Sequence, residues 1–235
     1  MIPLLGVPVL NRADLAARMV RSVDHPVEEM LVVINAPTEQ RVDMATEIQT
    51  AVNGNDSIRR VVFSFPSFNL GCGGSWNHII RHRPAGPWWL IVNADIQFGA
   101  GDLERLASRM DGESRPAFAT VFEFGAFGLN TACVDSVGWF DENLHPMYFE
   151  DNDYQRRMFL AGVDYEQLES TTRHDTSSTI NSDAALAARN DVTFRLNAAY
   201  YLEKWGGPPR AEKFSLPFGK GEKPVSRRRL ADQRW

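Results

Sequence analysis

The first half of the chain alternates four times between short apolar segments and segments with helical spacing, and this alternation limits the fold more than any other feature. Each apolar segment is bounded by Pro, Gly or Asn, as buried strands are. In the intervening segments apolar residues recur three and four positions apart, which is typical of amphipathic helices. The predicted strands are 2–10, 30–37, 59–65 and 88–95, and the predicted helices are 15–23, 39–52, 75–82 and 102–110.

This order predicts an α/β fold, with a mostly parallel central sheet and helices on both faces. The strands are apolar throughout rather than alternating, which fits a sheet that is covered on both sides. Ligands of such sheets bind beyond the carboxyl ends of the strands. The residues expected at that edge are Asn11, Arg12, Asn35, 69–74, Asn93 and Asp95.

The second half has a different pattern. Residues 118–127 are rich in Phe, Gly and Ala and predict further strand structure, and 134–143 is rich in turn residues. An amphipathic helix follows Asp153 and ends at Gly162, a good helix C-cap. Beyond residue 205 the prolines at 208, 209, 217 and 224 favour an extended tail or a lid over residues 206–235.

Charge and cysteine content exclude several functional classes. The net charge of −5 gives no overall basic field, so nucleic acid is not an expected partner. No apolar run reaches the eighteen or so residues of a membrane span, and the N-terminus lacks the basic region of a signal peptide. Cys72 and Cys133 form no CxxC motif, which predicts free thiols and a cytoplasmic location.

Asp95 and a glycine-rich turn are the first two candidate site features. Asp95 follows a strongly apolar strand, where a carboxylate could hold a divalent cation against a diphosphate or could serve only as a turn residue. The turn at 69–74 would let a ligand approach the backbone closely. It lacks the complete dinucleotide-binding fingerprint and the Walker A lysine.

The other two candidate site features are the acidic run at 150–153 and His174. The acids stand between an aromatic run and an amphipathic helix, so they are interpreted either as helix-capping groups or as catalytic carboxylates. An EF-hand is excluded, because Arg156 stands where its glycine is required. His174 could be a metal ligand or a structural partner of Asp175 or Thr176, and no G-x-S-x-G elbow supports a catalytic triad.

These features together resemble the motifs of family 2 glycosyltransferases, over nearly the whole chain as far as Trp205. The most specific part is the spacing within GWFDEN…MYFEDNDYQRRMFLAG. The matching stretches are Pro8-Val9-Leu10-Asn11-Arg12, Val33-Ile34-Asn35-Ala36, Asn69-Leu70-Gly71 with Gly74 and Asn77, Asn93-Ala94-Asp95, Glu150-Asp151-Asn152-Asp153, and His174.

The resemblance implies the GT-A fold of nucleotide-diphospho-sugar transferases and an inverting, single-displacement reaction. Asn35 and Asn93 stand where the family usually has Asp. The resemblance assigns binding of the nucleotide-sugar donor to Pro8, Leu10, Asn11, Arg12, Asn35, Asn69, Gly71, Gly74, Asn77, Asn93, Ala94 and Asp95.

It also implies a metal ion and a catalytic base. Asp95 and His174 would hold Mn²⁺ or Mg²⁺. Asp151 would be the general base, and its place at a helix start is expected to favour ionisation. Glu150 would orient the acceptor or the base.

The implied organisation is a single domain over residues 1–205, with a donor-binding half at 1–110 and an acceptor and catalytic half at 111–205. The acceptor would be a glycan, a polysaccharide precursor or a protein, and a homodimer is left open. Two alternatives remain. A sugar nucleotidyltransferase would need a Gly-rich basic loop after the first strand, where this chain has Val9-Leu10-Asn11-Arg12. A catalytically degenerate binding protein is favoured by Asn35 and Asn93, whereas Asp95, Asp151 and His174 favour an enzyme.

Overall fold

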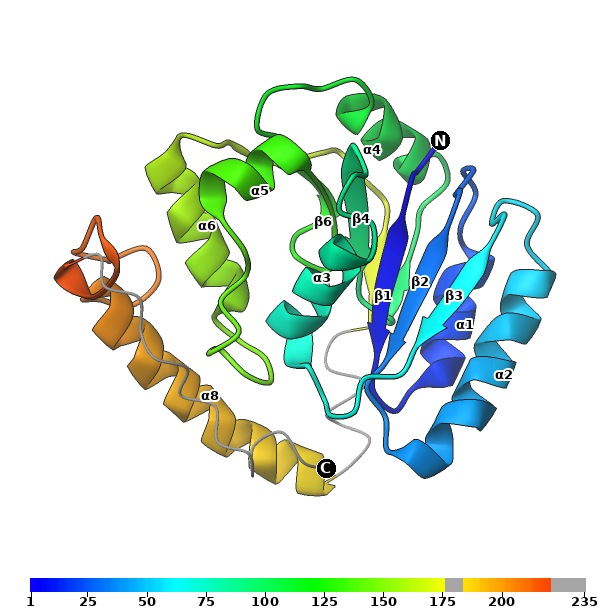
Figure 1. Ribbon diagram of the computed structural model, residues 1–235, viewed down its shortest axis with the longest axis horizontal. Coiled ribbons are helices and arrows are strands. Elements are labelled where there is room, and N and C mark those ends of the chain that lie inside the picture. Colours follow the sequence, from blue (N-terminus) through cyan, green and yellow to red (C-terminus); the bar gives the residue numbers. More distant parts are fainter. Residues whose placement is uncertain (176–183, 221–235) are drawn as a thin grey trace.

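A computed structural model describes residues 1–175 and 184–220, and its centre is a seven-stranded sheet of order β3-β2-β1-β4-β7-β6-β8 (Figure 1). Strands β1 to β4 run parallel, and β7 runs antiparallel to both of its neighbours. The predicted α/β fold is therefore confirmed. The strands are β1 (Leu5–Val9), β2 (Met30–Ile34), β3 (Val61–Ser64), β4 (Trp88–Val92), β6 (Phe118–Phe122), β7 (Ala126–Asn130) and β8 (Tyr165–Gln167).

Helices cover both faces of this sheet and enclose two separate cores. Every residue of β2 and β4 is buried, and successive side chains point to opposite faces, so each strand contributes to both cores. One face is covered by α1 (Ala13–Arg21), α2 (Arg41–Asn53) and α4 (Asp102–Met110). The other is covered by α3 (Gly71–His82), α5 (Thr131–Val137) and α6 (Glu150–Ala161).

Gly6 explains how closely α3 lies against the central strand. A Cβ at this position in β1 would come 2.2 Å from a side-chain carbon of Ile79 in α3. The hydrogen side chain therefore lets the helix sit directly on the strand. This contact fixes the N-terminus of α3 near the carboxyl ends of the parallel strands, where the candidate site lies.

Several predicted boundaries are wrong. The strand structure expected at 118–127 extends to Asn130 and consists of two antiparallel strands, β6 and β7, joined by a tight turn in which Gly125 N–H donates to Phe122 O. α3 begins at Gly71 rather than at residue 75, and α6 begins at Glu150 rather than after Asp153. The turn-rich segment begins with a helix, α5, whose N-cap Asn130 accepts a hydrogen bond from Cys133 N–H.

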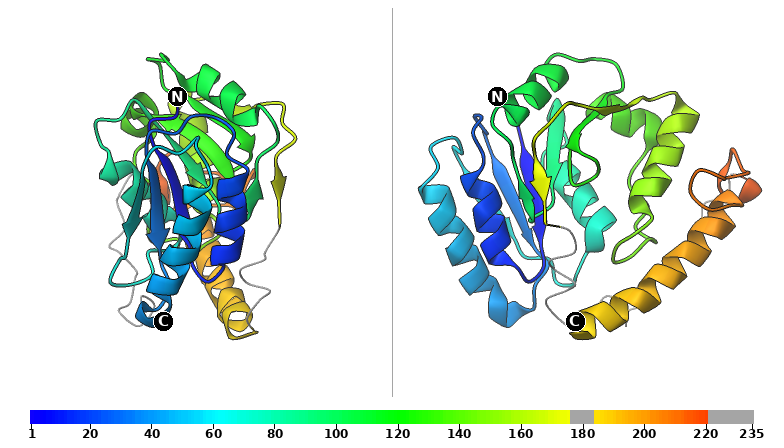
Figure 2. Two further views of the ribbon diagram at one scale, coloured as in Figure 1. Left: turned by 90° about the vertical axis from the view of Figure 1, so that its right-hand side faces the viewer. Right: turned by 180° about the vertical axis from the view of Figure 1, so that it is seen from behind.

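A long helix, α8 (Ala184–Trp205), lies at the edge of the molecule opposite α1 and α2, as the views from the front and from behind both show (Figures 1 and 2). The described part of the segment expected to be a tail or lid, 206–220, folds back on this helix. Phe214 N–H donates to Trp205 O, and Arg156 of α6 donates to Phe214 O. Residues 221–235 lie outside the described part of the chain.

Two short strands, β5 (Ile96–Gln97) and β9 (Arg173–His174), form a separate antiparallel pair. Ile96 is the register partner of His174. This pairing brings the end of the second half back to the carboxyl end of β4. Among the described helices, none has the length and apolar character that a membrane span requires.

Candidate active site

Asp95 and His174, the two predicted metal ligands, are in direct contact. Oδ1 of Asp95 lies 2.9 Å from Nε2 of His174, and Asp175 N–H donates to the carbonyl oxygen of Asp95. Both side chains are mostly buried. The hydrogen bond with Asp95 raises the pKa of the His174 imidazole, against the opposing effect of burial. The β5–β9 pairing therefore joins two residues that are distant in sequence.

This pair supplies a suitable but incomplete donor set for a metal ion. Carboxylate oxygen and imidazole nitrogen together suit Mn²⁺ better than Ca²⁺ or Mg²⁺. Within residues 1–175 and 184–220, no group of three His, Cys, Asp or Glu side chains could hold one ion. The phosphate oxygens of a nucleotide could complete the coordination of a cation held by Asp95 and His174.

Cationic side chains lie next to this pair. The guanidinium of Arg12, just beyond β1, donates two hydrogen bonds to Asp14, at 2.8 and 2.6 Å. The hydrogen bond with Asp14 raises the pKa of Arg12, and the charges of Asp175 and Asp95 contribute to the rise. Arg18 of α1 forms an ion pair with Asp175. Both guanidinium groups near this site are thus paired with acids of the protein itself.

The side-chain amides of Asn35 and Asn77, both assigned to donor binding, form hydrogen bonds within the protein. Asn35 is buried, its Nδ2 donates to Ser75 Oγ at 2.9 Å, and its Oδ1 accepts from Leu70 N–H at 3.0 Å. Asn77 is also buried, and its side chain donates to Phe140 O and accepts from Phe140 N–H, each at 2.9 Å. Both amides hold backbone segments near the start of α3.

The glycine-rich turn packs against another segment of the chain. Gly71 has a φ of +69°, and a Cβ there would come 2.5 Å from Pro146 O. Asn69 Oδ1 accepts from Gly71 N–H at 2.8 Å, and His145 contacts Asn69 O. The space beside Gly71, where a ligand was expected to approach the backbone, is therefore filled by residues 145–146.

The remaining assigned residues lie along the same edge of the sheet. Pro8 is paired with Val33 inside the parallel ladder, and Leu10 follows β1 directly. Asn93 N–H donates to Gly125 O, and Ala94 packs against one hydrophobic core. Asn11, Asn93 and Ala94 are partly exposed at the carboxyl ends of the strands, whereas Gly74 is buried in the first turn of α3.

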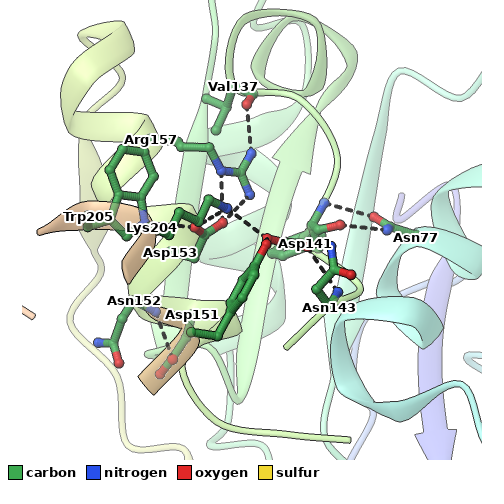
Figure 3. Close-up of polar contacts among 12 residues, drawn as sticks. Asn77, Val137, Asp141, Asn143, Asp151, Asn152, Asp153, Arg157, Lys204 and Trp205 are labelled. Atoms are coloured by element: carbon green, nitrogen blue, oxygen red, sulfur yellow. Dashed lines mark hydrogen bonds and ion pairs between the residues drawn. The ribbon is translucent and has the colours of Figure 1, made fainter. Parts of the chain in front are cut away.

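Glu150 and Asp151 form the first turn of α6. Glu150 is only 5% exposed, and its Oε2 has no hydrogen-bond partner among the described residues. Burial raises the pKa of Glu150 well above its ordinary value, and the charge of Asp151 adds to this rise. Burial also raises the pKa of Asp151, whose Oδ1 accepts from Asn152 N–H at 2.7 Å (Figure 3). The expectation that the helix start favours ionisation of Asp151 is therefore wrong, because burial has the larger effect.

Asp153 has a structural role. It is fully buried, and Arg157 and Trp205 both donate hydrogen bonds to it at 2.9 Å (Figure 3). Lys204 Nζ lies 2.5 Å from Asp153 Oδ1 and 2.8 Å from Asp141 Oδ2. Although burial acts against it, the charge of Lys204 lowers the pKa of Asp141 to about 2. This network joins α6 to the end of α8.

Cys72, which no sequence motif singles out as a site residue, lies next to the acids of α6. It lies in the first turn of α3, and its thiol is hydrogen-bonded to Glu150. Burial raises the pKa of Cys72 well above its ordinary value, and the charges of Glu150, Asp151 and Asp95 raise it further. The half-buried Cys72 therefore lies against the acids of α6, and the charge of Asp95 also acts on its thiol.

Known proteins provide independent evidence on this arrangement. Residues 5–130 match the model of the family described as "Glycosyl transferase family 2". A galactofuranosyl glycosyltransferase of Leishmania donovani is 36% identical over 78 residues, which are 33% of this chain and 17% of that protein. The chain thus spans about a sixth of the length of this curated relative.

Solved structures are similar in fold. The mannosyltransferase PcManGT from Pyrobaculum calidifontis, solved with GDP-Man and Mn²⁺, has a TM-score of 0.61 at 13% identity, with 85% of this chain and 65% of that chain covered. TarS of S. aureus has a TM-score of 0.53 at 16% identity, with 86% and 66% covered. These likenesses show a GT-A fold. With more than half of its length matched by the family, the chain belongs to glycosyltransferase family 2.

Proposed function

We propose that this chain transfers a sugar from a nucleotide-diphospho-sugar to an acceptor hydroxyl by an inverting single displacement, with Asp151 as the general base. The observation that carries the proposal is the 2.9 Å contact of Asp95 with His174 after β4, in a chain whose residues 5–130 match glycosyltransferase family 2. A candidate base and a candidate cation site beside one another are what such a transfer requires.

In the proposed reaction Asp151 accepts the proton of the acceptor hydroxyl. The acceptor oxygen forms a bond to the anomeric carbon of the donor sugar from the side opposite the nucleotide. The bond from that carbon to the diphosphate oxygen breaks, and its electron pair leaves with the nucleoside diphosphate. Because burial raises the pKa of Asp151, its carboxylate is a stronger base than an exposed aspartate.

Asp95 and His174 are the residues that would hold a divalent cation, Mn²⁺ or Mg²⁺. The fit rests on their 2.9 Å contact and on the mixture of oxygen and nitrogen ligands. The cation would neutralise the charge that develops on the departing diphosphate. The similar mannosyltransferase was solved with GDP-Man and Mn²⁺, which supports this part of the proposal. Arg12, beside Asp95, would add positive charge for the same phosphates.

The proposed division of labour follows the chain. Residues 1–110 would bind the donor at the carboxyl ends of β1 to β4, and residues 111–205 would supply the base and the acceptor site. Glu150, buried with one oxygen unpaired, would accept a hydrogen bond from a substrate hydroxyl and so orient it. A catalytically degenerate binding protein would have no need of an unpaired buried carboxylate beside the candidate base.

The test is transfer with a panel of nucleotide-sugars, Mn²⁺ and a mixture of simple glycan acceptors. We expect release of nucleoside diphosphate and a product whose anomeric configuration, measured by NMR, is opposite to that of the donor. Retained configuration would refute the single displacement. Donor binding without release of nucleoside diphosphate, for every donor that binds, would favour the degenerate binding protein.

A further inference from the structure

The turn before α6 has an unfavourable backbone conformation at two successive residues. Tyr148 has a φ of +76° and Phe149 has a φ of +72°, and neither is glycine. A non-glycine residue is disfavoured in the left-handed region, because its Cβ crowds the following carbonyl oxygen. Such a turn persists only where surrounding contacts hold it, and these two residues directly precede Glu150 and Asp151.

Asn197 of α8 makes the polar contacts that hold this turn. Its side chain is only 4% exposed, and its Nδ2 donates to Met147 O at 2.9 Å and to Tyr148 O at 3.3 Å. One amide group therefore uses its two N–H donors on two successive carbonyls. A side chain without these donors would leave both carbonyls of the left-handed turn without this support.

Aromatic contacts from the same face of α8 enclose the turn. Phe194 lies 5.3 Å from the ring of Tyr148 and 5.2 Å from the ring of Phe149, measured between ring centroids. Tyr201 lies 5.6 Å from the ring of Phe149. Phe194, Asn197 and Tyr201 are three and four positions apart, so they share one side of the helix.

The helix that follows the turn is held by α8 as well. Asp153, three residues into α6, accepts a hydrogen bond from Trp205 and pairs with Lys204 (Figure 3). Glu150 and Asp151 therefore lie between two points that α8 fixes, the turn at 147–149 and the side chain of Asp153. The hydrogen bonds of Asn197 fix the first of these points.

We propose that Asn197 is a positioning residue for the transfer reaction, because it holds the left-handed turn that places Asp151 at the acceptor hydroxyl. This rests on the proposed function, in which Asp151 is the base. Loss of the amide lets the turn relax and displaces the Asp151 carboxylate. A displacement of about 1 Å near the reacting atoms can lower the rate by about a hundredfold. Donor affinity is expected to persist, because Asn197 donates to the carbonyls of Met147 and Tyr148, and neither residue is assigned to the donor or to the cation.

The primary variant is Asn197→Ala, and Thr193→Ala is its matched control. Thr193 lies one turn earlier on α8, and its hydroxyl bonds the Arg189 and Asn190 carbonyls of its own helix. Asn197→Ala should lower kcat by roughly tenfold to a hundredfold. The KM for the donor and its Mn²⁺-dependent affinity should match wild type, and Thr193→Ala should match wild type throughout. An unchanged kcat, or an equal loss of donor affinity, would overturn the proposal.

A second pair of variants tests whether Asn197 acts through the turn. Glycine adopts a positive φ at little cost, so Tyr148→Gly reduces the need for the two hydrogen bonds. In a double-mutant cycle, Asn197→Ala should then have a clearly smaller effect on kcat in the Tyr148→Gly background. Equal effects in both backgrounds would refute the role of the turn. If Asn197→Ala does not fold alone, recovery of the fold by Tyr148→Gly supports the proposal, and failure of that recovery contradicts it.

A measurement that needs no turnover separates this proposal from the proposed function. The titration of Asp151 is followed by ¹³C NMR in wild type, Asn197→Ala and Thr193→Ala. Relaxation of the turn admits water, so the pKa of Asp151 should fall toward its ordinary value in Asn197→Ala alone. If the wild type transfers sugar from no donor, the proposed function fails. The NMR titration still shows whether Asn197 positions Asp151. An identical titration in all three proteins would show that Asn197 does not position it.

Discussion

Asn35 donates a buried hydrogen bond of 2.9 Å to the hydroxyl of Ser75, and this bond joins the end of β2 to the first turns of α3. A carboxylate at the same position could accept from Leu70 N–H, as Asn35 Oδ1 does, and from the Ser75 hydroxyl, but it would bury a negative charge there. The amide that the sequence presents as a departure from the family pattern therefore has a structural reason.

Asn35→Asp, which restores the usual family residue, should destabilise the protein by about 1–3 kcal/mol at pH 8, because it buries a negative charge. Burial should raise the pKa of the new carboxyl, so the loss of stability should shrink as the pH falls toward that pKa. Urea unfolding at several pH values measures this. Asn53→Asp, at the exposed end of α2, is the control and should show a smaller and nearly pH-independent change.

Asp151→Asn should lower kcat by about a hundredfold or more, because an amide cannot accept the acceptor proton. The side chain keeps its size, so donor affinity measured by calorimetry should stay within about twofold of wild type. Gln155→Ala, at an exposed position of the same helix, should retain full activity. Near-normal turnover by a folded Asp151→Asn protein would rule out this residue as the base.

Removal of divalent cations should abolish transfer, and His174→Ala should weaken Mn²⁺-dependent donor binding more than tenfold. A metal binds the neutral imidazole, whereas contact with Asp95 favours the protonated form by raising the pKa of His174. Mn²⁺ affinity should therefore rise as the pH increases through that raised pKa. Calorimetry between pH 6 and 8 tests this, and full activity after exhaustive chelation would contradict it.

Glu150→Gln should stabilise the protein while lowering its transfer activity. The folded state raises the pKa of Glu150, so stability falls as the pH rises from the unfolded value of this carboxyl through the folded value. Glutamine does not titrate, so the Glu150→Gln protein does not lose stability in this way as the pH rises. Thermal unfolding should show a higher Tm for Glu150→Gln at pH 8 and a smaller difference at pH 5. A lower Tm at pH 8 would mean that the carboxylate is better solvated than its burial indicates.

Local periodicity was sufficient to predict the parallel part of the sheet. Strands β1 to β4 are short apolar runs between Pro, Gly and Asn residues, so their type and order could be inferred without any long-range contact. The hairpin of β6 and β7 was missed, because its apolar pattern continues through the turn. That turn contains Glu123 at a φ of +40°, a conformation that nothing in the local sequence demands.

The candidate site was only partly accessible from the sequence. The strand-end positions of Asn11, Asn35 and Asp95 followed from the pattern, whereas the pairing of Asp95 with His174 depends on β5 and β9 meeting in space. Asn77 and Asn35 have the residue type of ligands, but their partners are backbone and side-chain groups that only the fold brings near. No local pattern distinguishes a buried amide of this kind from one that faces a ligand.

The contact of Lys204 with both Asp141 and Asp153 has a consequence for the design of shortened versions of this protein. The family match ends at residue 130, and the acidic helix ends at Ala161, so either point looks like a natural place to cut. A cut at either place removes the one ammonium group that contacts both carboxylates within the described residues. A shortened chain cut after α6 would bury Asp141 and Asp153 without this cation. The smallest fragment worth expressing therefore extends through Trp205.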